Sequence, residues 1–180
     1  MRRILKAAAA VSAVLGWIGC SSPTDATSTN ANISLSATPN PATAEPSSGV
    51  FYILQGDSNN PDQTLEYPFQ SSFTLTLTET GGEAVDITSI TLKVQQATGG
   101  IITPPTNGQV EHYQFVSSAS GKTLPAKGTV DIGFQVWYSL PNLRRECVAT
   151  VTLGFLDEKG TPNDSSDDIT FSKSLDVQIQ

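Results

Sequence analysis

Histidine, cysteine and charged side chains are scarce in this sequence. It contains one histidine, His112, and two cysteines, Cys20 and Cys147, among 180 residues, with no CxxC or Cys/His metal spacing. Transition-metal sites usually need several histidine or cysteine ligands. The GxSxG elbow of many hydrolases is missing, and any Ser-His-Asp or Cys-His arrangement would have to use the single histidine. We therefore expect a protein that is not an enzyme and that carries no cofactor.

Positive charge is the scarcer sign. The chain has ten Lys and Arg against seventeen Asp and Glu, and charged residues make up only 15% of it. Three of the positive charges, on Arg2, Arg3 and Lys6, lie in the first six residues. A mature chain without this segment would carry a net charge of about −10, which repels a phosphate backbone. We therefore expect no nucleic-acid partner.

No apolar run is long enough to span a bilayer comfortably. The longest, residues 7–18, follows the basic start MRRILK and is twelve residues long. A membrane-spanning helix needs about 20 apolar residues, whereas a run of this length suits the apolar region of a secretory signal. The small residue Gly19 precedes Cys20, as a signal peptidase requires near its cut. The sequence predicts a signal peptide over residues 1–19.

The residues around this cut carry a first resemblance. Trp17, Ile18, Gly19 and Cys20 resemble the lipobox of bacterial lipoproteins, with Trp17 standing where leucine is usual. The resemblance implies that Cys20 receives a thioether-linked diacylglycerol and anchors the protein to a membrane of the bacterial cell envelope. Since Ser21 replaces the aspartate that retains such proteins at the inner membrane, it implies the outer membrane where the host has one. The alternative is an ordinary secretory signal with a coincidental cysteine.

A polar segment follows the cysteine. Residues 21–32 are rich in Ser, Thr and Asn and contain no large apolar side chain. Such a segment cannot bury enough surface to order itself, and random-coil scaling gives it a reach of about 20 Å. We therefore divide the chain into the signal, a lipidated Cys20 with a flexible tether over residues 20–32, and one domain over residues 33–180.

Apolar residues alternate with polar ones through most of the domain. The alternating apolar positions are Ile33, Leu35 and Ala37; Phe73, Leu75 and Leu77; Ile90, Leu92 and Val94; Val130, Ile132, Phe134, Val136 and Tyr138; Cys147, Ala149, Val151, Leu153 and Phe155; and Ile169, Phe171, Leu175, Val177 and Ile179. Two weaker candidates cover residues 50–54 and 112–116. Strands with one apolar face must cover it with a second sheet. The pattern predicts an all-β fold, an antiparallel β-sandwich of about seven to eight strands, with a barrel as the alternative topology.

The middle of the domain carries a second resemblance. Residues 73–80 (FTLTLTET), the turn Gly81-Gly82, residues 85–94 (VDITSITLKV) and the later LPAKG of residues 124–128 resemble the immunoglobulin-like modules of bacterial exported proteins, including those called CARDB. The resemblance covers about residues 72–180 and implies an immunoglobulin-like sandwich. It implies no particular activity, because folds of this kind serve many functions.

One loop is a candidate metal site. Residues 157–168 (DEKGTPNDSSDD) place Asp157, Asp164, Asp167 and Asp168 between two predicted strands. Hard oxygen ligands in a flexible loop suit calcium, although the spacing is not that of an EF-hand. The glycine, proline, asparagine and serines of the same stretch equally describe an ordinary hairpin loop.

Two further side chains have competing interpretations. Cys147 is in phase with the apolar face of its strand, so we expect a buried, inert thiol, although Arg144 and Arg145 could lower its pKa. Trp137 falls on the polar side of its strand. It could anchor a partner or lie under a loop such as residues 61–69.

These observations favour a membrane-anchored bacterial lipoprotein whose immunoglobulin-like module is non-enzymatic and serves protein interaction, with another envelope protein as partner, or an accessory role in the envelope. One alternative is an inhibitor or ligand-binding module that uses the loops at residues 99–108 or 55–69, because loops on a rigid sandwich commonly carry recognition. Others are a calcium-binding surface domain and a hydrolase with an unrecognised site.

Overall fold

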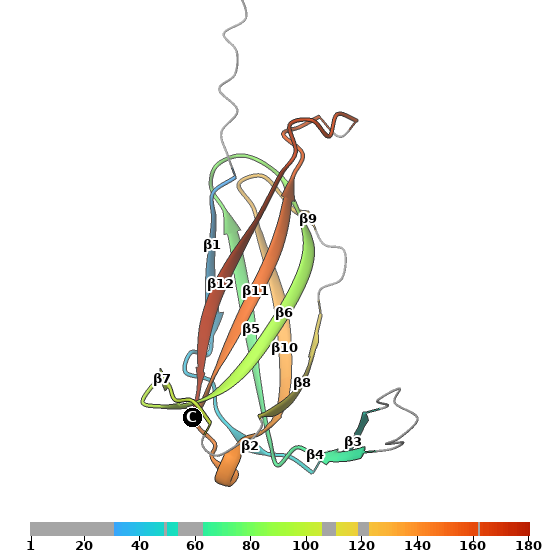
Figure 1. Cartoon of the computed structure of the whole chain (residues 1–180). Helices are drawn as coiled ribbons and strands as arrows, with labels where there is room; N and C mark the ends of the chain where they lie inside the picture. Colours follow the sequence, from blue (N-terminus) through green and yellow to red (C-terminus); the bar gives the residue numbers. More distant parts are fainter. Residues whose placement is uncertain (1–30, 49, 54–62, 106–110, 119–122, 162) are drawn as a thin grey trace, which may run out of the picture.

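The computed structural model describes residues 31–180, apart from residues 49, 54–62, 106–110, 119–122 and 162 (Figure 1). The predicted signal, Cys20 and nearly all of the tether lie outside these residues. The described elements are β1 (Ile33–Thr38), β2 (Glu45–Pro46), β3 (Val50–Ile53), β4 (Gln63–Glu66), β5 (Phe69–Glu79), β6 (Val85–Thr98), β7 (Ile101–Ile102), β8 (His112–Ser117), β9 (Thr123–Leu124), β10 (Thr129–Ser139), the 3-10 turn η1 (Pro141–Leu143), β11 (Cys147–Asp157) and β12 (Ile169–Ile179). None of the helices in this described part is long and apolar enough to cross a bilayer.

Two antiparallel sheets face each other (Figure 1). One has the strand order β1-β5-β10-β8, with β2 also paired to β5, and the other has the order β12-β11-β6-β7, with β9 also paired to β6. If β1, β5, β6, β8, β10, β11 and β12 are lettered A to G in chain order, the first sheet has the order ABED and the second the order GFC. This is the strand arrangement of the constant-type immunoglobulin fold. The predicted all-β sandwich is therefore confirmed, and the barrel alternative is wrong because the ladder is not closed between the two sheets.

Strict alternation along each long strand builds the core. In β11 the inward residues Ala149, Val151, Leu153 and Phe155 are fully buried, while the residues between them are partly exposed. Inward residues of β5 and β10 meet them from the opposite sheet, and the rings of Phe73 and Phe134 stack there with centroids 5.2 Å apart. Because a strand sends successive side chains to opposite faces, the apolar set of each strand lies between the sheets.

The segment after β1 crosses from one sheet to the other. Ala42 forms a parallel bridge with Ile179, its N–H donates to the Gln178 carbonyl (2.7 Å), and its own carbonyl accepts the Gln180 N–H (2.9 Å). Pro39 marks the exit from β1, since proline cannot donate to a ladder. The first strand thus joins the two sheets along one side of the sandwich.

A buried carboxylate closes the end of the sandwich at which β1 begins. Glu79 is 1% exposed, and its two oxygens accept N–H groups from Asn32 (3.0 Å), Gly81, Gly82 (2.9 Å) and Lys127 (2.8 Å). Burial alone would raise the pKa of Glu79, but these four hydrogen bonds outweigh it and hold the pKa below its usual value. The carboxylate fastens the start of β1, the β5–β6 turn and the turn before β10 to one another.

Strands β3 and β4 form a separate two-stranded ribbon. They pair antiparallel from Val50↔Glu66 to Ile53↔Gln63, and the ribbon projects sideways from the sandwich (Figure 1). The weak strand predictions at residues 50–54 and 112–116 are confirmed by β3 and β8. The predicted irregular loop at residues 55–69 is wrong in its second half, which contains β4 and the start of β5.

Candidate functional site

The acidic loop between β11 and β12 holds its carboxylates by local bonds. Asp157 is 2% exposed, its Oδ2 lies 3.2 Å from Lys159 Nζ, and its Oδ1 accepts the Lys159 N–H (2.9 Å). Asp164 Oδ1 accepts the Ser166 N–H (3.0 Å), and the Ser166 bonds lower the pKa of that carboxyl. Asp167 accepts the Thr161 hydroxyl (2.9 Å). These contacts are those of an ordinary polar hairpin loop.

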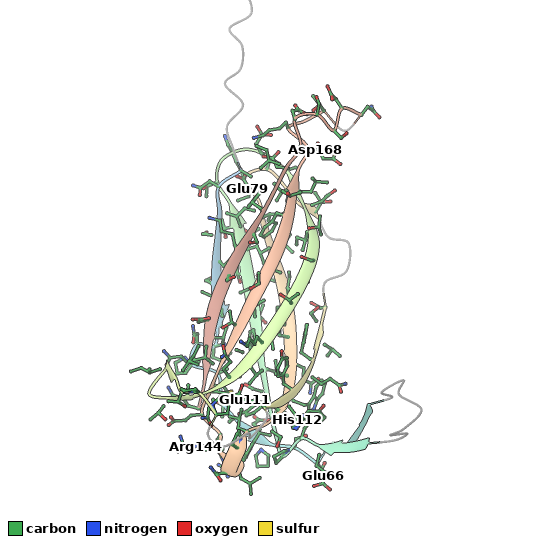
Figure 2. All side chains as sticks on the ribbon, in the orientation of Figure 1. Glu66, Glu79, Glu111, His112, Arg144 and Asp168 are labelled. Atoms are coloured by element: carbon green, nitrogen blue, oxygen red, sulfur yellow. The ribbon has the colours of Figure 1, made fainter. Side chains whose placement is uncertain are left out.

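The four predicted calcium ligands do not gather around one point. Asp157, at the end of β11, has its own lysine partner, and Asp168 is half-buried directly before Ile169, the residue of β12 that pairs with Asp157 (Figure 2). Across the described residues, the structure contains no group of three or more Asp, Glu, His or Cys side chains that could hold a metal ion. The predicted calcium site stays a prediction, and the loop geometry supplies no support for it.

Cys147 lies in the core at the start of β11, as its phase predicted. Burial raises the pKa of this thiol to about 12, while the hydrogen bond with Tyr138 acts in the opposite direction. Neither arginine lowers the pKa of the thiol. Arg144 donates to the Thr98 hydroxyl oxygen (3.5 Å), and Arg145 places its guanidinium over the Phe69 ring, 5.4 Å from the centroid. The Arg145 carbonyl accepts the Tyr138 hydroxyl (2.8 Å). The thiol is therefore protonated at neutral pH and inert.

His112 is exposed at the start of β8, opposite Ser139 of β10. It lies at the same end of the sandwich as Glu111 and Arg144, away from Asp168 (Figure 2). The carboxylate of Glu111 binds the backbone of β6, because its Oε1 accepts the Gln96 N–H (2.8 Å). The structure thus places the single histidine at the surface, on a strand of the β1-β5-β10-β8 sheet, and its non-catalytic interpretation stays a prediction.

Two turns at this same end carry exposed apolar side chains. The turn Gly99-Gly100, with φ of 58° and 78°, joins β6 to β7 in the two-residue geometry that favours glycine at both positions. It presents Ile101, which is 72% exposed, and Ile102. The predicted irregular loop at residues 99–108 therefore begins as a tight hairpin.

The turn after β10 adds a third apolar side chain. Leu143 in η1 is 70% exposed and has a left-handed backbone (φ 53°), as does Asn142 before it (φ 60°). A non-glycine residue in this region costs about 1 kcal/mol or more. Two bonds from Glu146 link the turn region to the β6–β7 hairpin: its carbonyl accepts the Ala97 N–H (3.1 Å) and its Oε2 the Gly99 N–H (3.3 Å). We call Ile101, Ile102 and Leu143 the distal tip.

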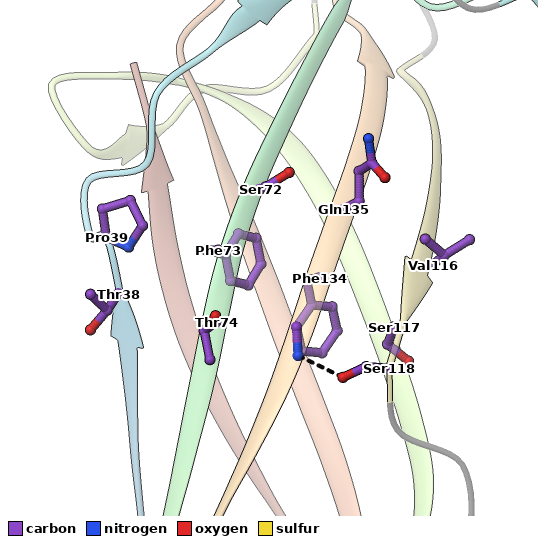
Figure 3. Close-up of a pocket in the computed structure, with 11 residues that line it drawn as sticks. Thr38, Pro39, Ser72, Phe73, Thr74, Val116, Ser117, Ser118, Phe134 and Gln135 are labelled. Carbon is purple, nitrogen blue, oxygen red and sulfur yellow. Dashed lines mark hydrogen bonds between the residues drawn. The ribbon is translucent and has the colours of Figure 1, made fainter.

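A hollow of about 550 Å³ lies on the outer face of the β1-β5-β10-β8 sheet (Figure 3). Cross-strand register sets its rows: Thr38, Thr74 and Gly133 form one, and Ser72, Gln135 and Val116 form the next. We call this feature the Gly133 hollow, because the missing side chain of Gly133 leaves its middle open. Ser118 borders it and accepts the Gly133 N–H with its hydroxyl oxygen (2.8 Å).

Sequence reasoning missed this hollow, although the signal was present. Gly133 interrupts the outward-facing positions of a strand that is otherwise well formed. Trp137 lies on the same outer face, in a row with Gln70 and Gln114, and is half-buried. Part of the loop that was expected to cover Trp137, residues 61–69, falls outside the described residues, so the choice between its two interpretations stays open.

No family model matches the chain, and no curated protein matches its sequence. The two resemblances in the sequence therefore depend on the residues quoted for them.

Proposed function

We propose that this protein is a membrane-anchored bacterial lipoprotein whose immunoglobulin-like sandwich acts by binding another envelope protein rather than by catalysis. The observation that supports the proposal best is the position of the two ends. The strand that follows the tether, β1, begins at the end of the sandwich that carries the β11–β12 loop, and the distal tip lies at the opposite end (Figure 1). A domain held through Cys20 would present the distal tip away from the membrane.

The chemistry of the distal tip fits a protein partner. Ile101 and Leu143 are large, apolar and more than two-thirds exposed. Two such side chains at one end gain free energy when a partner removes them from water, about 25 cal/mol per Å². The left-handed backbone at Leu143 is a local strain that a fold keeps most readily where the presented side chain is used.

Membrane attachment is tested by labelling. Cells that express the full chain with an alkyne-bearing palmitate should label the protein, and Cys20→Ala should abolish the label and release the chain from the membrane fraction. Cys147→Ala is the matched control and should keep the label, because Cys147 lies in the core. An unlabelled, soluble wild-type protein would contradict the anchor.

The distal tip is tested by site-specific photocrosslinking in intact cells. A benzoylphenylalanine at position 143 should give a discrete crosslinked protein, and Ile101→Ser should reduce that product. The control places the same group at the exposed Thr170, at the start of β12 and at the end of the sandwich opposite the distal tip. Equal products from both positions, or none from position 143, would contradict the proposed role of the tip.

A further inference from the structure

We propose that the Gly133 hollow is a binding site for a neutral glycan, separate from the distal tip and from the anchor. Its floor is formed by the middle of β5 and β10, with β1 and Pro39 on one side and Val116 of β8 on the other (Figure 3). It is an open depression of about 550 Å³ on the sheet surface rather than an enclosed cavity.

Gly133 has no conformational reason to be glycine. Its φ is not positive, and its pairing with Thr74 continues the β5–β10 register without a bulge. An added Cβ would meet only Ser118 Oγ, at the ordinary contact distance of 3.7 Å. Glycine inside a strand weakens it, and the usual reasons are a bulge, a bend or the close approach of another molecule. Since no residue that the structure describes fills the space above Gly133, we take the close approach of a ligand as the reason.

Gly154, the other glycine inside a long strand of the described residues, is a useful comparison because its surroundings leave little room for a Cβ. It lies in β11 at the register shift against β6, where an added Cβ would come within 2.4 Å of Ser89 Oγ. The Ser89 hydroxyl therefore gives Gly154 a packing reason to be glycine. The same test leaves Gly133 without such an explanation.

The lining of the hollow selects the ligand class. Most of its exposed lining is apolar, with Pro39 and Val116 at its sides, and its polar side chains are those of Thr38, Ser72, Thr74, Ser118 and Gln135. No ionisable side chain among the described residues borders it, in a protein with seventeen acidic residues. Hydroxyl and amide side chains both donate and accept hydrogen bonds, which matches sugar hydroxyls that do the same. An ionic ligand would find no counter-charge. An extended peptide pairs best with a free strand edge, whereas this floor is the middle of a sheet.

The outer face offers a continuation for a longer glycan. Trp137 follows Gln135 on the same side of β10, about 7 Å further along the strand, and Gln70 and Gln114 flank it on the neighbouring strands. An aromatic ring beside amide side chains suits the apolar face and the hydroxyls of a pyranose. The hollow and this row together describe a linear site that runs along β10.

Binding is tested with the full chain purified in detergent. The probes are neutral oligosaccharides of defined composition, namely cellohexaose, maltohexaose, chitohexaose and mannohexaose, with oligogalacturonate as the acidic probe and a Ser/Thr-rich neutral peptide as the extended-chain probe. We expect at least one neutral oligosaccharide to bind by calorimetry, and neither the acidic nor the peptide probe. Gly133→Val should weaken this binding about tenfold or more, which corresponds to about 1.4 kcal/mol.

Two controls separate a loss of binding from a loss of folding. Valine suits a strand, so Gly133→Val should fold, and circular dichroism checks this before the titration. Thr91→Val, on the exposed face of the other sheet, is the matched control and should bind as wild type does. Failure of all four neutral probes, preference for the acidic or peptide probe, or unchanged binding by Gly133→Val would each overturn the glycan site. These results are independent of labelling at Cys20 and of crosslinking at position 143, so either proposal can fail alone.

Discussion

Replacing the buried Glu79 with glutamine should destabilise the domain more than the same kind of change at any surface carboxylate. Each carboxylate oxygen accepts two backbone N–H groups: Oε1 those of Asn32 and Gly81, and Oε2 those of Gly82 and Lys127. Glutamine keeps one accepting oxygen and directs an NH₂ group at the other two donors. Two part-buried N–H groups then lose their partner and face another donor.

The expected loss follows from those two donors. Leaving a buried donor unsatisfied costs about 1–3 kcal/mol, and part-buried donors lie in the lower half of this range, so we expect about 2–4 kcal/mol in the free energy of unfolding. For a domain of this size, each kcal/mol shifts Tm by roughly 2–4 °C. Glu79→Gln should therefore unfold about 5–15 °C below wild type at pH 7 when ellipticity is followed on heating.

The difference in stability between wild type and Glu79→Gln should depend on pH. Because the pKa of Glu79 in the folded state lies below its usual value of 4.5, its contribution is present at neutral pH and is lost as pH falls through the folded-state pKa. The gap between wild type and Glu79→Gln should thus narrow below about pH 4.5. Glu83→Gln removes the same charge from the same turn region and should change the free energy of unfolding by about 0.5 kcal/mol or less. A Glu79→Gln variant that melts with wild type at pH 7, or a gap that stays constant down to pH 3, would refute this reasoning.

Three further predictions concern single side chains. Gly133→Ala should raise the free energy of unfolding by about 0.5–1 kcal/mol, because the new methyl meets only Ser118 Oγ at 3.7 Å; a loss in denaturant titration would contradict it. Gly154→Ala should lower it, since the Cβ would lie 2.4 Å from Ser89 Oγ; an unchanged midpoint would show that the bulge relaxes freely. Cys147, with a pKa of about 12, should react with iodoacetamide only after unfolding, and alkylation of the native protein at pH 8 within minutes would show an accessible thiolate.

Much of the fold could be predicted from period-two alternation. The apolar set of residues 147–155 marks β11 because one side of that strand must be hidden between the sheets. Glu79 also follows this phase, two residues after Leu77, and so points inward. An acid at an inward position signals a buried carboxylate, but only the turns that approach it in space reveal its four N–H donors.

Other features depend on contacts that a linear pattern does not contain. The crossing of Ala42 to the second sheet is set by its bonds with Gln178 and Gln180, more than 130 residues away. The acidic loop at residues 157–168 has the composition of a calcium site, yet Lys159 and Thr161 engage two of its carboxylates locally. The Gly133 hollow needs four strands in register, so one glycine in a strand pattern could only hint at it.

The proposal that the sandwich is held at the membrane by Cys20 is tested most directly by mass spectrometry of the N-terminal peptide from the membrane fraction. We predict a mature chain that begins at Cys20 and carries a diacylglyceryl group on its sulfur. A chain that begins at another residue, or an unmodified Cys20, would contradict the account.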